Sequence, residues 1–453
     1  MHSYAYPEHE KQFGALATEI GFTHVSLSSD IMQMVKAVPR GLTACVDAYL
    51  TPCIKRYLQS FSSGFKNLDE SRVHFMQSDG GLTDLSSFSG SRAILSGPAG
   101  GVVGYAMTTA FKDAKLPVIG FDMGGTSTDV SRFSGKYEHV FETTTAGVTI
   151  QAPQLDINTV AAGGGSRLFL RSGLFVVGPE SSGSEPGPVC YRKNGYLAVT
   201  DANAALGRIV PGYFPKIFGP EKNQALDVQA SKSALEKVCP EGYTWEETAV
   251  GFLDVANETM CRPIRAITQA KGFDTSKHVL ATFGGAGGQH CCAIARNLGI
   301  EKVFVHKYAG ILSAYGMALA DVVHEEQEPS AFHYDQLEKI LQRSELVRER
   351  ASQQLESSKT EFKTIETELY LHMRFDKTDF GLMISEQEVD NTWREAFEKR
   401  YKSEFGFVLS DRKIWIDDIR VRAVGKSNVE MDLLNKGNAF SDQPECVVKT
   451  YRV

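Results

Sequence analysis

The sequence predicts an α/β protein with an α+β region at its C-terminal end. Residues 278–306 read as strand, glycine turn, helix and strand, which is the β-turn-α-β unit of a parallel sheet. Residues 367–384 and 413–425 alternate apolar and polar side chains, as half-buried strands do. With 453 residues, 42% of them hydrophobic, the chain can form roughly two to four domains with well-developed cores.

The first sixty residues predict an αβα opening. Residues 8–20 are amphipathic with helical spacing, residues 23–28 (THVSLS) read as a strand, and residues 43–62 carry apolar side chains at helical intervals. This opening precedes the first glycine cluster of the chain.

Three further helices are predicted from apolar periodicity. Residues 244–272 form a long helix that contains Pro263 as a candidate kink and ends at a glycine. Residues 308–321 form a shorter helix rich in small side chains, and residues 335–366 are charged and helical in character, with a solvated face.

Glycine is concentrated in the hundred residues that follow the opening, in clusters between strand-like runs. The clusters are 96–104 (SGPAGGVVG), 122–129 (DMGGTSTD), 161–167 (AAGGGSR) and 178–188 (GPESSGSEPGP). So much glycine with so little charge is unusual for surface loops that only connect elements.

The cluster at residues 122–129 turns between two apolar strands. Its tip carries bare backbone amides and hydroxyls, which can bind phosphate oxygens because glycine lets the main chain approach closely. Asp122, at the end of the first strand, could hold Mg²⁺, and either Asp122 or Asp129 could orient a nucleophile. A hairpin whose glycines need positive φ explains this loop alone about equally well.

Residues 283–290 (FGGAGGQH) follow a strand and open a helix, where a nucleotide's sugar or phosphate can lie near the helix N-terminus. A tight βα turn is the alternative. No GxxxxGK[ST] sequence occurs, and the next strand ends in His306 instead of the acid of a dinucleotide-binding unit. P-loop and NAD sites are therefore disfavoured.

Charge and cysteine content limit the partners. The formal charge of −7 and the lack of a long basic block argue against a nucleic acid or an anionic membrane. The apolar runs fall short of the ~20 residues of a membrane helix. Eight scattered cysteines and no signal-peptide pattern are typical of the cytosol. We expect a cytosolic protein that binds small molecules or proteins.

The order of the glycine segments resembles one superfamily. Residues 96–107, 121–133, 283–290 and 309–321 resemble the connect-1, phosphate-2, adenosine and connect-2 segments of the actin, hexokinase and heat-shock ATPases, whose lobes are ribonuclease H-like. More narrowly, the chain resembles the hydantoinase A/5-oxoprolinase family. The runs that carry this narrower resemblance are 40–52, 94–101, 159–167, 177–191 and 199–208.

The resemblance implies ATP-dependent opening of a cyclic amide, 5-oxo-L-proline to L-glutamate, through phosphorylation of the amide carbonyl oxygen, with ATP and Mg²⁺ bound. It implies catalytic roles for Asp122, Asp129 and Arg167, with Asp122 also as the metal ligand. Arg167 would neutralise the transferred phosphoryl group, although it could instead pair with a surface acid. The implied phosphate-2 residues are Gly124, Gly125 and Thr126, the adenosine residues Gly284, Gly285 and Gly287, and the residues near substrate or transferred phosphate Gly163, Gly164, Gly165 and Ser166.

The same resemblance divides the chain into three ranges. Residues 1–42 are the tail of the hydantoinase/oxoprolinase N-terminal region, residues 43–327 the ATPase-like domain, and residues 328–453 the C-terminal α+β region. Family members carry a phosphate-1 hairpin upstream, and the eukaryotic type also carries a hydantoinase B-like portion. We expect a central fragment that lacks both and turns over little alone.

Three functions follow as alternatives. The first is an oxoprolinase-type enzyme acting on 5-oxoproline or a related lactam or hydantoin, completed by a hydantoinase B-like partner or by a homo-oligomer. The second is a catalytically silent nucleotide-binding or regulatory module of the same fold. A sugar or acetate kinase is the third, and it is disfavoured because a simple kinase does not need the runs at residues 96–101, 161–167 and 178–188.

Overall fold

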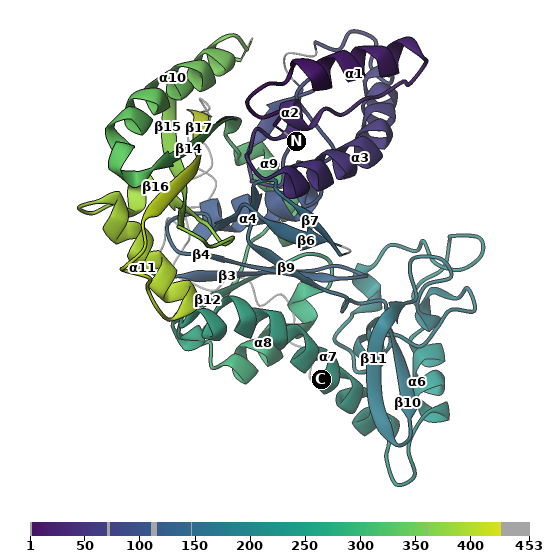
Figure 1. The fold of residues 1–453 in the computed structure, drawn as a ribbon. Helices are drawn as coiled ribbons and strands as arrows, with labels where there is room; N and C mark the ends of the chain where they lie inside the picture. The colour runs from purple at the N-terminus through teal and green to yellow at the C-terminus, as the bar shows by residue number, and fades with distance from the viewer. Residues whose placement is uncertain (1, 70–72, 110–115, 146, 359, 427–453) are drawn as a thin grey trace. The chain divides into compact units, whose positions relative to one another are not determined.

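The computed structural model describes residues 2–69, 73–109, 116–145, 147–358 and 360–426 (Figure 1). The described chain forms two compact units. Unit 1 lies within residues 1–96, 139–155 and 320–430, and unit 2 lies within residues 97–138 and 156–319. Both units are assembled from separate segments, so they divide the chain differently from the three ranges expected from the sequence. No helix among the described residues is long and apolar enough to cross a membrane.

Unit 2 is built on a five-stranded sheet. Its strands, in spatial order, are β13 (Lys302–Val305), β12 (Val279–Phe283), β3 (Val118–Met123), β4 (Thr128–Phe133) and β9 (Ile157–Val160). The first three run parallel, and β4 and β9 are antiparallel to their neighbours. Helix α8 (Gly287–Leu298) connects β12 to β13. This arrangement confirms the β-turn-α-β unit that the sequence predicts.

Helices cover both faces of this sheet. On one face, α8 and α7 (Trp245–Ile267) pack against strand side chains such as Phe121 in one buried apolar cluster (Figure 1). A Cβ on Gly120 would lie 2.2 Å from the Tyr105 ring of α4 (Ser96–Thr109), which places α4 on the opposite face, since neighbouring strand residues face opposite sides. The remaining elements of unit 2 are β10 (Ser166–Arg171), β11 (Leu174–Ser181), α5 (Val199–Ala205), α6 (Val228–Lys237) and α9 (Leu312–Leu319).

Helix α7 confirms most of the long helix predicted from Thr244 onward. It begins after Thr244 with a capping box, in which Thr244 and Glu247 satisfy each other's backbone amides. The α-helix ends at Ile267, a short 3₁₀ turn follows, and Gly272 closes that turn in the left-handed conformation.

The glycine cluster at residues 96–104 lies inside helix α4 and not in a loop between strands. Glycine in a helix costs about 1 kcal/mol relative to alanine, so a close contact must compensate. That contact is a crossing with α9: a Cβ on Gly316 would lie 1.8 Å from the Gly100 carbonyl oxygen and 2.5 Å from the Gly104 nitrogen. The glycines let the two helix backbones touch.

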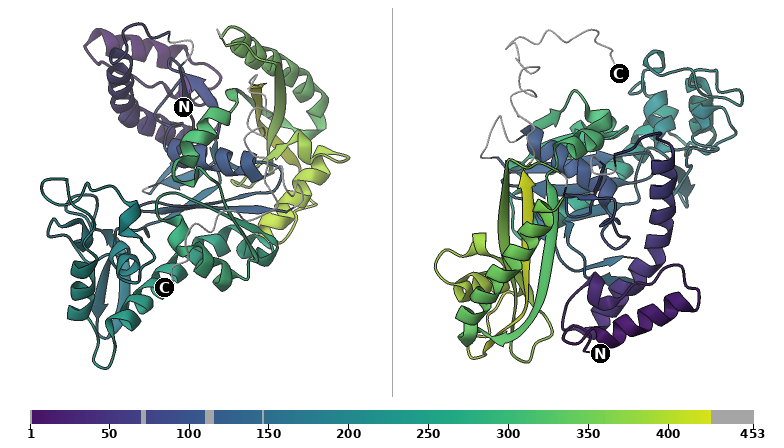
Figure 2. Two further views of the ribbon diagram at one scale, coloured as in Figure 1. Left: turned by 180° about the vertical axis from the view of Figure 1, so that it is seen from behind. Right: turned by 90° about the horizontal axis from the view of Figure 1, so that it is seen from above.

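Unit 1 contains a six-stranded sheet. Its strands, in spatial order, are β1 (His74–Met76), β2 (Leu82–Asp84), β14 (Val322–His333), β17 (Ile414–Lys426), β15 (Thr364–Phe375) and β16 (Leu382–Ser385). All neighbours are antiparallel except β2 and β14. Helices α10 (Leu337–Glu356) and α11 (Trp393–Phe405) contribute to the same buried cluster as the long strands, and α10 lies along them (Figure 2).

The other elements of unit 1 are α1 (Glu8–Glu19), α2 (Ser28–Ile31), α3 (Ala37–Ser63), β5 (His139–Val140), β6 (Thr143–Thr145), β7 (Val148–Ile150) and β8 (Gln154–Leu155). The helices predicted at residues 8–20 and 43–62 are confirmed, although α3 starts earlier. The strand predicted at residues 23–28 is wrong. The Glu10 carboxylate accepts hydrogen bonds from the Ser28 and Ser29 amides, and Ser26 donates to Asp47, so side-chain hydrogen bonds replace a strand ladder there.

We expect Gly316→Ala to destabilise the protein, because the new methyl group would meet backbone atoms of α4 that cannot rotate away. The loss should be about 1–3 kcal/mol, as for overpacked cores, in the free energy of unfolding measured by urea titration. Gly310→Ala is the matched control, since nothing lies within 4 Å of its Cβ position. Equal stability of the two variants would refute the close helix crossing.

Candidate functional site

The site is built around the β3–β4 hairpin. The register of the hairpin pairs Asp122 with Asp129, so the two carboxyl side chains lie on the same face of the sheet. This confirms the hairpin predicted at residues 118–130. Gly124, Gly125 and Thr126 form its tip, where Gly125 and Thr126 are exposed.

The tip glycines are not needed for backbone conformation. Neither Gly124 nor Gly125 has a positive φ, so the interpretation of an ordinary hairpin with positive-φ glycines does not hold here. A Cβ built on Gly125 would meet nothing within 4 Å. The Gly124 amide donates to the Ser127 carbonyl at 3.1 Å, whereas the exposed residues Gly125 and Thr126 leave the main chain open to a close approach by an anion.

Both carboxyl groups of the hairpin are held in an environment that disfavours their charge. Burial, and then the charge of Asp129, raises the pKa of Asp122 to about 6. Burial also raises the pKa of Asp129, although the Thr159 hydroxyl donates a hydrogen bond to its Oδ1 and opposes the shift. In the described part of the chain neither carboxyl forms an ion pair with a cationic side chain. A bound cation would stabilise the ionised forms of Asp122 and Asp129.

The AAGGGSR segment lies directly against the hairpin tip. The Gly164 and Gly165 amides donate to the Gly124 and Gly125 carbonyl oxygens at 3.0 and 2.6 Å. A Cβ on Gly163 would lie 2.7–2.8 Å from backbone atoms of Gly125 and Thr126. Only glycines permit this approach, so the backbone of residues 163–165 lies in direct contact with the backbone of the hairpin tip.

The FGGAGGQH segment reaches the same hairpin from the neighbouring strand. Gly284 has a φ of +81°, and a Cβ there would lie 2.3 Å from Asp122 Oδ1. The Ala286 amide donates to the Met123 carbonyl at 2.9 Å. Gly285 is exposed with nothing within 4 Å of its Cβ position, and Gly287 begins α8. The two glycine segments predicted to hold a nucleotide therefore lie side by side.

Several polar groups that the sequence did not single out also belong to this region. Thr200 donates through its amide and its hydroxyl to the Gly164 carbonyl, both at 2.8 Å, and the Ser182 amide donates to the Gly165 carbonyl at 2.7 Å. Ser182 lies in the GPESSGSEPGP tract, so the tract does reach the site. Thr159, which holds Asp129, had no signal in the sequence beyond its place before the AAGGGSR segment.

Three buried oxygen atoms at this site have no hydrogen-bond partner: Ser182 Oγ, Thr282 Oγ1 and Gln289 Oε1. Buried polar atoms are normally paired. Thr282 Oγ1 lies beside Gly287, 2.5 Å from its Cβ position, and Ser182 Oγ lies 3.1 Å from that of Gly165. These atoms would gain partners from a polar ligand against the glycine segments.

Arg167 and Ser166 start strand β10. Ser166 Oγ accepts from the Gly163 amide at 2.9 Å and so shapes the glycine loop. The Arg167 guanidinium stacks on the Tyr196 ring, 3.8 Å from its centroid, and its Nε has no partner. Among the described residues no carboxylate pairs with it, whether a surface acid, Asp122 or Asp129. The structure therefore does not bring Arg167 to the carboxyl pair.

The residues present fit Mg²⁺ with a nucleotide. Within the described ranges no group of three or more His, Cys, Asp or Glu side chains could hold a metal by itself. Magnesium usually needs only one or two carboxylates, because phosphates and waters complete its shell. Asp122 and Asp129 supply those carboxylates, and the glycine segments supply the space and the amides.

Comparisons with known proteins agree with this geometry. The family model described as Hydantoinase/oxoprolinase matches residues 40–326. The chain is 51% identical to 5-oxoprolinase of Dictyostelium discoideum, covering 100% of this chain and 38% of that protein. It is 52% identical to 5-oxoprolinase 1 of Arabidopsis thaliana, covering 95% of this chain and 36% of that protein. The chain therefore spans little more than a third of the length of these relatives.

Caprolactamase of Pseudomonas jessenii is a more distant relative. Its alpha subunit is 29% identical, covering 88% of this chain and 60% of the subunit. The crystal structure of the ATP-dependent caprolactamase matches with a TM-score of 0.78 at 26% identity, covering 94% of this chain and 64% of that one. These matches confirm the expected α/β class with actin-like ATPase lobes, and with the family model they show that this chain belongs to the hydantoinase/oxoprolinase family.

Proposed function

We propose that this chain is the ATP-binding part of a 5-oxoprolinase-type cyclic amidohydrolase, which opens 5-oxo-L-proline to L-glutamate. The observation that carries the proposal is the carboxyl pair Asp122 and Asp129 beside a hairpin tip at which neither Gly124 nor Gly125 has a positive φ. The 5-oxoprolinase names of relatives at about half identity support the choice of substrate.

Each glycine segment has a separate role in this proposal. The tip residues Gly124, Gly125 and Thr126 bind phosphate oxygens, and Gly284, Gly285 and Gly287 accommodate the adenosine part. Gly163, Gly164, Gly165 and Ser166 lie near the transferred phosphate or the lactam. The main-chain hydrogen bonds between Gly164, Gly165 and the hairpin tip would couple phosphate position to substrate position.

Asp122 and Asp129 have different roles in this proposal. Asp122 would hold Mg²⁺, whose charge would neutralise phosphate oxygens, and bound ATP would supply the phosphoryl group that makes the amide carbonyl a better electrophile. Asp129, oriented by the Thr159 hydroxyl, positions the attacking water. Arg167 would have to leave the Tyr196 ring to reach a transferred phosphoryl group.

A catalytically silent nucleotide-binding module of the same fold is the second candidate. It is favoured by the stacking of Arg167 on Tyr196, because that arrangement does not hold Arg167 ready to neutralise a transferred phosphoryl group. Binding of Mg-ATP without hydrolysis in the presence of 5-oxo-L-proline would favour this candidate over the enzyme.

We also propose that the chain works in the cytosol beside a hydantoinase B-like polypeptide or further copies of itself. The Pseudomonas jessenii relative carries the name caprolactamase subunit alpha, which supports a second subunit. The domain ranges 1–42, 43–327 and 328–453 remain part of this proposal, and the family model at residues 40–326 is close to the middle range.

Asp122→Asn should remove measurable Mg-ATP binding, because the uncharged amide is a much weaker Mg²⁺ ligand than a carboxylate. The measurement is isothermal titration of the purified chain with Mg-ATP. Glu221→Gln is the matched control, since Glu221 is exposed and lies outside the glycine segments. We expect the wild type and Glu221→Gln to bind Mg-ATP and Asp122→Asn not to bind it. Unchanged affinity in Asp122→Asn would refute the phosphate-site assignment.

Asp122→Asn should also stabilise the ligand-free protein at neutral pH. The pKa of Asp122 rises on folding from 3.8 to about 6, so between these values the folded state holds a proton that the unfolded state releases. The contribution of Asp122 to the free energy of unfolding therefore falls by roughly 2–3 kcal/mol as the pH rises through that window. The variant should exceed the wild type in free energy of unfolding at pH 8, and the difference should shrink toward pH 4.

The measurement is urea denaturation at a series of pH values without nucleotide or Mg²⁺. Glu221→Gln again serves as the control for the loss of one exposed carboxylate. An Asp122→Asn variant that is less stable than the wild type at pH 8 would contradict the raised pKa.

A further inference from the structure

His290, the last residue of the FGGAGGQH segment, is fully buried in unit 2 and has no part in the function proposed above. It lies in the first turn of α8, directly after the glycines that are proposed to accommodate adenosine. Both of its ring nitrogens are hydrogen-bonded. Nδ1 lies 2.8 Å from Asn257 Oδ1 of α7, and Nε2 lies 2.9 Å from Asn203 Nδ2 of α5. One side chain therefore joins α5, α7 and α8.

The two partners of His290 define its protonation state. Asn257 presents a carbonyl oxygen, which can only accept, so Nδ1 carries the proton. Asn203 presents its NH₂ group, which donates, so Nε2 is unprotonated and accepts. Burial, and then the charge of Arg208, lowers the pKa of His290 to about 4, in agreement with a neutral ring. The ring is a bridge with one donor and one acceptor.

Helix α5 also reaches the glycine segments directly. Thr200, one turn before Asn203, donates through its amide and its hydroxyl to the Gly164 carbonyl. A Cβ on Gly164 would lie 2.9 Å from Thr200 Oγ1 and 3.7 Å from Ala286 Cβ. Gly164 therefore lies between α5 and the FGGAGGQH segment, and the bridge at His290 joins the same two elements a second time.

Helix α7 contacts the hairpin one turn after Asn257. There the Thr128 hydroxyl, at the start of β4, lies 3.4 Å from Met260 Sδ. The same hydroxyl donates to the Ala162 carbonyl at 2.6 Å, directly before the glycines at residues 163–165. The part of α7 that holds His290 is thus also packed against the hairpin.

A buried histidine can simply be a core residue whose hydrogen bonds are satisfied. Two observations favour a more specific role for His290. Each of its partner helices contacts the hairpin or the AAGGGSR segment, as described above. In addition, Asn203 turns its NH₂ group to His290 while its own Oδ1 is buried without a hydrogen-bond partner. An unpaired buried oxygen is costly, so stability alone does not explain this arrangement.

We propose that His290 is a positioning residue of the candidate nucleotide site, which holds the FGGAGGQH segment against the AAGGGSR segment and the hairpin by joining α8 to α5 and α7. The inference rests on the proposed function, because nucleotide binding by these segments is part of it. His290 touches no ligand in this proposal. It acts through the backbone of the glycines that precede it, whose place relative to the hairpin sets how well phosphate and adenosine contacts form together.

The first test is isothermal titration of the full chain with Mg-ATP. His290→Leu removes both hydrogen bonds of the bridge and should weaken binding at least tenfold, because a misplaced segment loses its contacts. His290→Gln carries one donor and one acceptor in its side-chain amide and should stay within about threefold of the wild type. Equal affinity in His290→Leu and a wild type that binds would overturn the positioning role.

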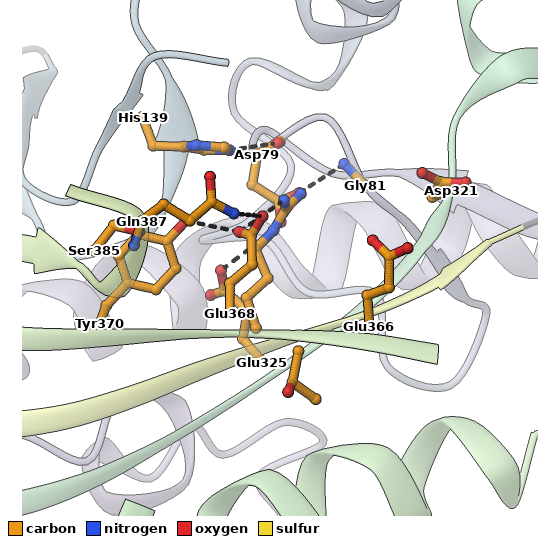
Figure 3. A network of polar contacts seen from close by, with 12 residues as sticks. Asp79, Gly81, His139, Asp321, Glu325, Glu366, Glu368, Tyr370, Ser385 and Gln387 are labelled. Carbon is orange, nitrogen blue, oxygen red and sulfur yellow. Dashed lines mark hydrogen bonds and ion pairs between the residues drawn. The ribbon is translucent and has the colours of Figure 1, made fainter. Parts of the chain in front are cut away.

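Asn203→Leu is a milder variant for the case that His290→Leu does not fold. It breaks the link between α5 and α8 but also removes the unpaired Oδ1, and leucine has nearly the shape of asparagine. It should also weaken Mg-ATP binding. The matched control is Tyr370→Phe, which removes one hydrogen bond to Glu368 from the polar network of unit 1 that Figure 3 shows. The control should bind Mg-ATP as the wild type does, and circular dichroism checks every fold.

Hydrogen exchange without nucleotide separates this inference from the proposed function. The Gly284 and Ala286 amides donate to the Ala309 and Met123 carbonyls and should be protected in the wild type. Their exchange should be at least threefold faster in His290→Leu and Asn203→Leu, and unchanged in Tyr370→Phe. Unchanged exchange in both bridge variants overturns the positioning role. A wild type that binds no Mg-ATP contradicts the proposed function, and the exchange measurement then decides by itself whether His290 holds the segment.

Discussion

The candidate nucleotide site depends on direct contact between two backbone segments of the chain. Gly164 and Gly165 donate to the carbonyls of Gly124 and Gly125, and a side chain at Gly163 would overlap the hairpin backbone. Because the contact is between backbone atoms, its geometry is set by the folds of β3, β4 and β10 and not by rotamers. It holds both loops in place before any ligand is present, which is the preorganisation that electrostatic catalysis requires.

The arrangement of the hairpin has an electrostatic cost. The same register that aligns the hairpin pairs Asp122 with Asp129, where burial opposes the ionisation of both and the charge of Asp129 further opposes that of Asp122. Thr159 offsets part of this cost at Asp129 only. A site of this kind is less stable empty than occupied, which is common where charged groups serve binding instead of folding.

The sequence predicted the parts of the fold that are local. The hairpin at residues 118–130 and the β12-α8-β13 unit follow from strand and helix periodicity, and the capping box of α7 is visible as Thr244 and Glu247. Residues 96–104 were misread because four glycines disfavour a helix locally, whereas the crossing with Gly316 that stabilises α4 lies more than two hundred residues away. Helix α11 was missed, since its apolar residues are outnumbered by charged ones. Thr159, Ser182 and the bridge at His290 depend on tertiary contacts that no spacing reveals.

The strand order of unit 1 determines when that unit can become complete during synthesis. The described part of the chain ends with β17, yet β17 lies in the middle of the sheet, hydrogen-bonded to β14 on one side and β15 on the other. Until residues 414–426 leave the ribosome, β14 and β15 each present an unpaired edge, and strands with such edges are prone to associate with other chains. Unit 2 has all its described strands by residue 305. The glycine segments can therefore be in place while β17 is still needed to close the other sheet.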